Sequence, residues 1–209
     1  MKLVVTEIKK YFNDQLVLHC PSFELDQGGA LLITGDNGSG KTTLLRLLAG
    51  ALSADQGSVF IGEGKSRALY EPGFFQFSDL TVSEHLAFYR GLSWNSSVLE
   101  EYSHLFDLQR FYSHKVSGLS KGWKVRLGLT AAFGRDADLL LLDEPLDGLD
   151  EGGRQMLSEC LVRYRQRNSS GCVCIASHER EFFSLLSPTH LPLCARKSEQ
   201  VASYGTGSS

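Results

Sequence analysis

The chain has 209 residues and a mass of 23.1 kDa, which is enough for one full domain with its own core. Its 42% hydrophobic and 22% charged residues are typical of a globular protein and disfavour disordered, collagen-like and disulfide-scaffold classes. The net charge of −3 gives no electrostatic reason to expect broad capture of nucleic acid or anionic lipid. We therefore expect a soluble protein with no nucleic-acid partner.

The amino-terminal residues lack the apolar stretch and cleavage site of a signal peptide, and no later window approaches the ~20 apolar residues of a membrane span. The five cysteines are an odd number without a zinc-type pair, which favours a reducing, cytosolic compartment. Cys172 and Cys174 stand two apart in an apolar run. We interpret them as core residues on one face of a strand rather than as metal ligands.

Short apolar runs predict strands at residues 3–8, 30–34, 58–61, 139–142 and 172–176. The second, fourth and fifth runs are apolar at nearly every position, which is typical of parallel strands covered on both faces. Helices are predicted from Thr42 to a cap at Gly50, and over residues 154–167, where apolar residues repeat every three or four positions. Strands that alternate with helices indicate an α/β domain.

The stretch 79–133 differs, because it offers amphipathic helix candidates near 81–90 and 98–105 and no convincing buried strand. We interpret it as a helical insertion. The arginines at positions 163, 165 and 167 are interpreted as a solvated helix end rather than a nucleic-acid patch. The closing residues 205–209 are expected to be a frayed tail.

A phosphate-binding loop follows the apolar run at 30–34 and precedes the first predicted helix. Its pattern, G-x-x-x-x-G-K-[ST], is met by Gly35, Asp36, Asn37, Gly38, Ser39, Gly40, Lys41 and Thr42. Glycines let backbone N–H groups approach phosphate oxygens, and the helix amino terminus adds its dipole. In this geometry Lys41 reaches the β- and γ-phosphates and the Thr42 hydroxyl ligates Mg²⁺, with Thr43 beside it.

A second half-site is expected where the leucine run 139–142 ends in Asp143 and Glu144. Adjacent acids at the end of a buried strand are costly unless they meet a cation or hydrogen-bond donors. We expect Asp143 to hold Mg²⁺, mainly through water, and Glu144 to act as general base for an attacking water. The two half-motifs, in this order, support each other.

With these residues in place, the chain resembles the nucleotide-binding subunit of an ATP-binding cassette (ABC) transporter over nearly its whole length. Residues 119–123 read Leu-Ser-Lys-Gly-Trp where the family has its L-S-G-G-Q signature, 145–150 resemble its aspartate loop, and 176–178 its switch-histidine segment. The resemblance implies a P-loop NTPase (RecA-like) α/β core with an antiparallel amino-terminal β subdomain. A single ABC ATPase domain, 1–209, is implied, with core residues 1–78 and 134–209 and a helical subdomain, 79–133.

The resemblance also implies that ATP binding closes a dimer, either a homodimer or a pair with a second cassette. Ser120 and Gly122 are then implied to contact the γ-phosphate bound by the other subunit, and Asp147 belongs to the aspartate loop. His178 is implied to contact the γ-phosphate and to hold the water and Glu144. Since the chain has no membrane span, transport requires separate integral membrane subunits, which would place it at the inner face of the cell membrane.

Two features depart from the family pattern. Lys121 and Trp123 replace the first signature glycine and the glutamine, a variant similar to that of single-cassette exporters, including haem exporters of cytochrome c biogenesis. The Q-loop position, a metal ligand in the family, is open between Glu71 and Gln76.

Adenine is implied to stack on Phe12, with Tyr11 as the alternative.

The predicted function is that of a transporter ATPase. Rival hypotheses are a soluble ABC-type ATPase acting on ribosomes or DNA and a small-molecule kinase. The former usually has paired cassettes or a long coiled coil, and the latter leaves Ser120, Asp147 and His178 without a role.

Overall fold

The computed structural model describes residues 2–73, 77–92 and 95–194. An antiparallel sheet is built from β1 (Leu3–Phe12), β2 (Gln15–Cys20), β3 (Phe23–Leu25) and β5 (Gln56–Phe60). The long strand β1 pairs with each of the other three. Asn13 and Asp14 turn the chain from β1 into β2 with φ of 47° and 63°, a left-handed conformation that these two residue types tolerate well.

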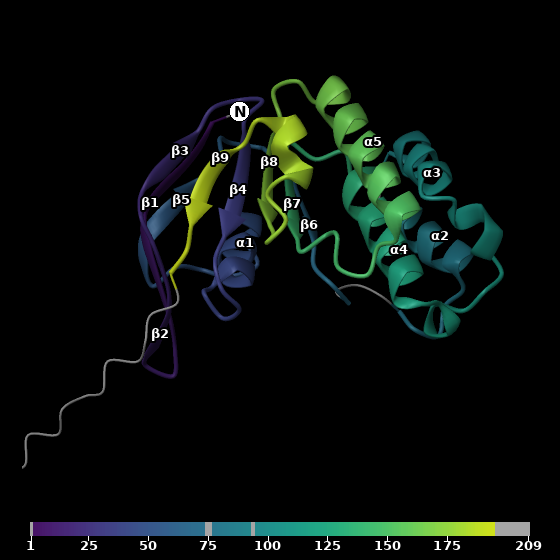
Figure 1. The fold of residues 1–209 in the computed structure, drawn as a ribbon, viewed down its shortest axis with the longest axis horizontal. Coiled ribbons are helices and arrows are strands. Elements are labelled where there is room, and N and C mark those ends of the chain that lie inside the picture. Colours follow the sequence, from purple (N-terminus) through teal and green to yellow (C-terminus); the bar gives the residue numbers. More distant parts are fainter. Residues whose placement is uncertain (1, 74–76, 93–94, 195–209) are drawn as a thin grey trace, which may run out of the picture.

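A parallel sheet holds the remaining strands, β4 (Ala30–Thr34), β6 (Arg67–Tyr70), β7 (Leu139–Asp143), β8 (Cys172–Ala176) and β9 (Thr189–Pro192). Their order is β6-β7-β8-β4-β9. The three inner strands are buried at every position, as the continuous apolar runs predict. Figure 1 shows this sheet between the antiparallel sheet and most of the helices.

Alternation along the inner strands divides the core into two clusters. Leu139 and Leu141 point into a cluster shared with the antiparallel sheet and α1 (Lys41–Ala49), which ends at Gly50 as predicted. Leu140 and Leu142 point the other way, toward α5 (Glu151–Arg167). Cys172 and Cys174 both lie in the first cluster, which confirms that they share a buried face.

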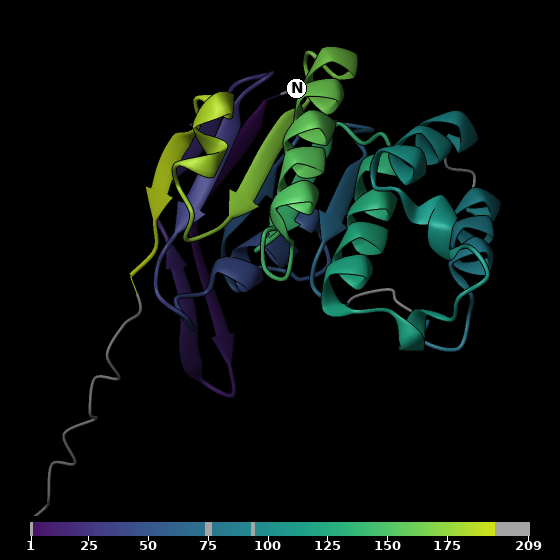
Figure 2. The same ribbon diagram turned by 45° about the vertical axis from the view of Figure 1, so that its right-hand side comes forward.

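The region between β6 and β7 is helical where the structure describes it. It contains α2 (Val82–Gly91), α3 (Ser96–Leu105) and α4 (Lys121–Gly134), with 3₁₀ turns at Leu108–Phe111 and Val116–Gly118. Thr81 and Glu84 form a reciprocal capping box at the start of α2. Figure 2 shows α4 and α5 side by side, with α2 and α3 beyond α4. One continuous core joins these helices to the sheet.

Four strands were not predicted: β2, β3, β6 and β9. They are short or mixed in composition and acquire strand structure from backbone pairing with neighbours, so local periodicity does not reveal them. A 3₁₀ turn at Phe182–Leu186 leads to β9. The predicted frayed tail, 205–209, lies outside the described residues.

The predicted arginine-rich helix end is present, since Arg165 and Arg167 lie in the last turn of α5 and Arg163 and Arg167 are exposed, but all three side chains are also paired. Arg163 and Arg167 both bind the Glu101 carboxylate of α3. Arg165 donates to two backbone carbonyls, those of Gly28 and Leu186, at 2.9 and 3.0 Å. The three guanidinium groups therefore join α5 to neighbouring segments, because long arginine side chains reach acceptors on both sides of the helix.

Candidate functional site

The predicted phosphate loop and the acidic strand end meet at one edge of the parallel sheet. The loop follows β4, Asp143 ends β7, and Ser177 and His178 follow β8. Glu71 directly follows β6 at the same edge. Because the carboxyl ends of parallel strands lie together, residues more than a hundred positions apart in the chain become neighbours.

The loop glycines are required by its path. Gly35 has φ of 153°, and a Cβ there would lie 2.3 Å from the Leu193 carbonyl oxygen. Gly40 has φ of 94° and caps α1 without a side chain, so nothing of its own covers the first backbone amides of the helix. Such amides, together with the helix dipole, favour an anion at this point.

The Lys41 ammonium is held over the loop. Its Nζ donates to the carbonyl oxygens of Gly35, at 2.8 Å, and Asp36, at 3.3 Å. The same nitrogen lies 3.3 Å from His178 Nε2 and 3.6 Å from Glu144 Oε1. Only 7% of Lys41 is exposed, so the charge is fixed in position before any ligand arrives.

Thr42 and Asp143 join the start of α1 to the end of β7. The Thr42 hydroxyl donates to Asp143 Oδ2 at 2.6 Å. Burial raises the pKa of the Asp143 carboxyl above its ordinary value, and this effect, with the nearby charges of Glu144 and Glu71, outweighs the Thr42 hydrogen bond. A hydroxyl and a buried carboxylate in need of a counter-charge are hard oxygen donors that fit Mg²⁺.

Glu144 occupies a strained backbone position beside His178. Its φ is 41°, a left-handed value unusual for glutamate, and its N–H donates to the Ala176 carbonyl oxygen at 2.9 Å. Its Oε1 lies 3.2 Å from His178 Nε2. The strained turn therefore aims the carboxylate at His178 and at Lys41 of the phosphate loop.

A surface depression of about 330 Å³ lies over these groups. Its lining comprises Val17, Asn37, Gly38, Gly40, Lys41, Thr42, Thr43, Pro72, Asp143, Glu144 and Asp147. A volume of this size suits a small-molecule ligand or the phosphate part of a larger one. Most of the predicted phosphate-side residues are thus brought together, and His178 contacts two of them.

The signature residues lie elsewhere and do not line this depression. Ser120 is exposed at the amino end of α4, and its hydroxyl caps nothing. Gly122 faces the aspartate loop closely, since a Cβ there would lie 2.7 Å from the Gly148 carbonyl oxygen. Lys121 Nζ donates to Asp147 Oδ1 at 2.7 Å. Within one chain, the signature segment therefore contacts the aspartate loop rather than the phosphate loop.

The sequence left two candidates for the Q-loop position and two for the ring that stacks on adenine. Glu71 is mostly buried and bound by both Nε and Nη2 of Arg46. Gln76 lies outside the described residues. Phe12 is 46% exposed where β1 ends, and Tyr11 beside it is half-buried, and neither lines the depression.

Two sets of contacts were missed from the sequence, one at the phosphate-loop edge of the sheet and one next to the signature segment. Arg46 lies one helical turn after Thr42 on α1, and this spacing is the sequence signal that places both side chains on one face of the helix. The second is the packing around Trp123, whose ring lies 4.2 Å from Phe111 and 4.3 Å from the Arg126 guanidinium. Arg126 in turn donates to Asp150, the cap of α5, at 2.6 Å.

A second cavity, of about 420 Å³, opens between α1, β6, α2 and α4. Its lining is mainly apolar and includes Phe77, Phe88 and Leu92, which are each more than 40% exposed. Large apolar side chains exposed in a group are typical of surfaces that bind another protein.

The fold and the phosphate loop define a P-loop nucleotide-binding domain. Residues 18–147 match the family model for ABC transporters, and the chain belongs to this family. A solved structure described as the ATP-binding subunit of an ABC transporter shares the fold with a TM-score of 0.79 at 22% identity. The match covers 92% of this chain and 86% of that one.

Two relatives indicate the range within the family. The chain is 28% identical over 203 residues to the Fe(3+) ions import ATP-binding protein FbpC 2 of Haemophilus influenzae, covering 86% of this chain and 55% of that protein. It is 30% identical over 209 residues to the cytochrome c biogenesis ATP-binding export protein CcmA of Reclinomonas americana, covering 90% and 92%. The chain thus spans about half of the former and most of the latter.

Across residues 2–73, 77–92 and 95–194, no helix has both the length and the apolar character that crossing a bilayer requires.

Proposed function

We propose that the chain binds ATP with Mg²⁺ and hydrolyses it to drive transport by separate membrane subunits. The observation that carries this proposal is the meeting of two sets of contacts at one sheet edge. Thr42 binds Asp143, and Lys41, Glu144 and His178 contact one another. Family membership supports it. In this proposal the single ABC domain spans 1–209, with core segments 1–78 and 134–209 around a helical subdomain, 79–133.

The phosphate side of the proposed site binds and neutralises charge. Lys41 and the backbone amides of the loop bind the β- and γ-phosphates. The Thr42 hydroxyl, directly, and the Asp143 carboxylate, mainly through water, would hold Mg²⁺, which would further neutralise the phosphate oxygens. Phe12 offers an exposed ring on which adenine stacks.

The hydrolytic step uses Glu144 as general base. The water oxygen bonds to the γ-phosphorus while the bond from that phosphorus to the β–γ bridging oxygen breaks, and Glu144 takes the water proton. ADP and phosphate leave. His178, within 3.2 Å of the Glu144 carboxylate, holds it in line with the γ-phosphate.

The proposed assembly is a dimer closed by ATP. Ser120 and Gly122, which do not face the depression of their own chain, contact the γ-phosphate held by the other subunit. The membrane subunits dock in the second cavity, against Phe77, Phe88 and Leu92, at the inner face of the membrane. Glu71 occupies the candidate Q-loop position among the described residues, and its carboxylate is bound by Arg46.

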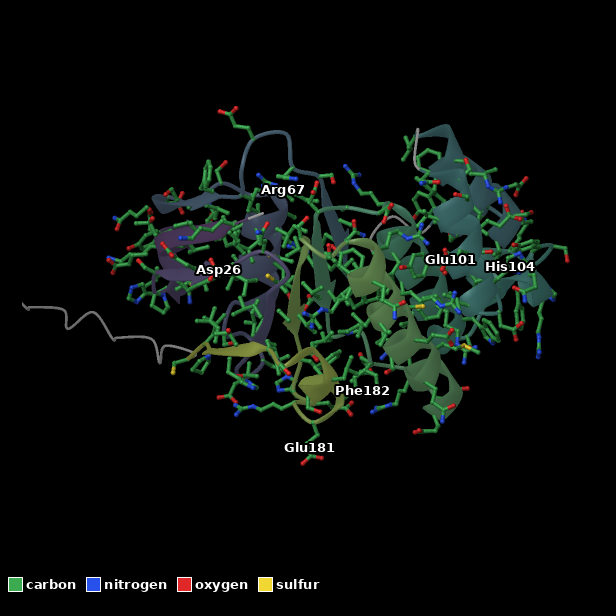
Figure 3. The ribbon with its side chains drawn as sticks, turned by 90° about the horizontal axis from the view of Figure 1, so that it is seen from above. Asp26, Arg67, Glu101, His104, Glu181 and Phe182 are labelled. Carbon is green, nitrogen blue, oxygen red and sulfur yellow. The ribbon has the colours of Figure 1, made fainter. Side chains whose placement is uncertain are left out.

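Nucleotide binding and turnover test the catalytic assignment. Lys41→Ala should lose ATP binding and hydrolysis, because the fixed cation is removed. Glu144→Gln keeps the shape but not the base, so it should bind ATP, fail to cleave it and accumulate as a closed dimer in size-exclusion chromatography. Lys2→Ala and Glu181→Gln are matched controls, since Lys2 precedes β1 and Glu181 points away from the molecule in Figure 3. Full turnover by Lys41→Ala would refute the assignment.

A substitution at Ser120 tests the role across the dimer. Ser120→Arg should leave ATP affinity of the monomer nearly unchanged while depressing hydrolysis, because bulk and charge block closure. Ser113→Arg, at an exposed turn nearby, is the matched control. Mixing Ser120→Arg with Lys41→Ala places both changes at one composite site and leaves the other intact, so activity should rise above that of either homodimer. Unchanged hydrolysis in Ser120→Arg would contradict a signature that acts on the partner's nucleotide.

A further inference from the structure

An arginine–carboxylate pair lies at the same sheet edge, next to the proposed metal position. Arg46 Nε donates to Glu71 Oε2 at 2.9 Å, and Nη2 of the same guanidinium binds Oε1. The Glu71 side chain is 13% exposed and that of Arg46 42%. A two-pronged pair of this kind has a defined geometry that a lysine cannot reproduce.

Like the Thr42–Asp143 hydrogen bond, the pair joins a residue of α1 to a carboxylate at the end of a parallel strand. Thr42 and Arg46 are one turn apart on α1 and face the same sheet edge. Tyr70 pairs with Leu142 in the β6–β7 ladder, so Glu71 and Asp143 are the next residues of two adjacent parallel strands. Glu71 is therefore a neighbour of the carboxylate that is proposed to hold the metal.

The Arg46–Glu71 pair matters because several negative charges lie at this edge of the sheet. Glu71, Asp143 and Glu144 bring three carboxylates to a site proposed to receive phosphates, and Lys41 contacts only the last of them. A free carboxylate here repels phosphate oxygens when no metal is present and adds an anionic oxygen ligand when one is. Bound by Arg46, the Glu71 carboxylate is neutralised and does neither.

We propose that Arg46 is a positioning residue that sets the metal affinity of the nucleotide complex by keeping the Glu71 carboxylate paired and off the metal. This inference rests on the proposed ATP site. Because the paired Glu71 carboxylate adds no ligand to the cation, metal release is easier than an additional carboxylate ligand would allow. The chain thereby carries an acid at this sheet edge without the electrostatic penalty of an unpaired charge.

A double-mutant cycle in the full chain separates this role from simple structural support. Arg46→Met, Glu71→Gln and the double variant are compared with the wild type. Mn²⁺ binding is followed by electron paramagnetic resonance with a saturating non-hydrolysable ATP analogue, and analogue affinity is measured separately in EDTA. Arg46→Met should tighten Mn²⁺ about ten-fold, equivalent to about 1.4 kcal/mol, and weaken the analogue in EDTA several-fold.

Both effects should disappear when Glu71→Gln is added, because no carboxylate is then released. Arg46→Lys keeps the charge without the fork and should lie between Arg46→Met and the wild type in both measurements; it also serves if Arg46→Met fails to fold. The inference would be overturned if Arg46→Met had effects of equal size with and without Glu71→Gln. It would also be overturned if Arg46→Met changed the Mn²⁺ affinity and the analogue affinity in the same direction. Failure of the wild type to bind the analogue would instead refute the proposed function.

Discussion

Asp143 has its carboxylate almost fully buried, with 5% of the residue exposed. Thr42 donates one hydrogen bond to it, yet its pKa is raised because burial and two nearby acids disfavour its charge. Such a side chain costs stability in the nucleotide-free chain. The Mg²⁺ site proposed above would account for its presence, because a bound cation offsets the cost of the buried charge.

Replacing this carboxylate by an amide should stabilise the chain while impairing metal-dependent nucleotide binding. We expect Asp143→Asn to raise the free energy of unfolding by about 1 kcal/mol near pH 7 without ligand, because the Thr42 hydrogen bond survives and the buried charge does not. Thermal or denaturant unfolding measures it. Asp79→Asn, at an exposed position, is the control and should change little.

The stability gained by Asp143→Asn should depend on pH in a defined direction. Because the folded pKa of Asp143 is raised, the folded chain takes up a proton more readily than the unfolded chain. Wild-type stability is therefore lost at this residue as the pH rises through the folded pKa, and is fully present below the unfolded value. The advantage of Asp143→Asn should shrink as the pH falls. An advantage that grows at lower pH would contradict the raised pKa.

The start of helix α4, which carries the signature segment, packs closely against the aspartate loop. Gly122 and Gly148 approach closely, and the Lys121 side chain lies over Gly148 while its ammonium binds Asp147. The Trp123–Arg126–Asp150 contacts add a second connection, from α4 to the first turn of α5. Movement of the signature segment is thus linked to the loop that follows Glu144.

A methyl group at the contact should disturb this packing. In Gly122→Ala the new Cβ meets the Gly148 carbonyl oxygen, a backbone atom, so the aspartate loop must shift. We expect ATP affinity within two-fold of wild type and hydrolysis lowered roughly ten- to hundred-fold, since a displacement of about 1 Å near a reacting group has effects of this size. Gly118→Ala, which meets nothing within 4 Å, is the matched control. Equal activity of the two variants would count against the linkage.

At the scale of the whole chain, the helical region is joined to the sheet by a common core and by ion pairs. Glu101 of α3 binds Arg163 and Arg167 of α5, whereas Glu100 lies 3.9 Å from His104 on its own helix. Figure 3 shows Glu101 on the side of α5 and His104 farther out on the helical region. One carboxylate therefore bridges two helices through residues that are 62 and 66 positions apart in the chain.

Removing the charge of Glu101 should loosen this connection. Glu101→Gln is expected to lower the free energy of unfolding by about 0.5–1 kcal/mol at low salt, with a smaller loss at high salt, because the pairs are partly exposed and are screened. Denaturant unfolding at two ionic strengths measures the difference. Glu100→Gln should have almost no effect, and a loss equal to that of Glu101→Gln would argue against a specific bridge.

Local patterns predicted the three inner strands and the phosphate loop. A parallel strand covered on both faces must be apolar at nearly every position, and β4, β7 and β8 confirm this expectation. The order of strand, glycine loop and helix is likewise contained in a few consecutive residues, and Gly35 and Gly40 adopt the backbone that it requires. Features whose physical cause is local were therefore readable from the sequence.

Contacts between segments distant in the chain could not be predicted from the sequence. The short strands β6 and β9 exist because neighbours supply their backbone hydrogen bonds, and the sheet order then places Glu71 beside Asp143. The Arg46–Glu71 and Lys121–Asp147 pairs join residues 25 and 26 positions apart. Which charges meet depends on strand register and helix packing, and these arise from the burial of the whole core rather than from any single stretch of residues.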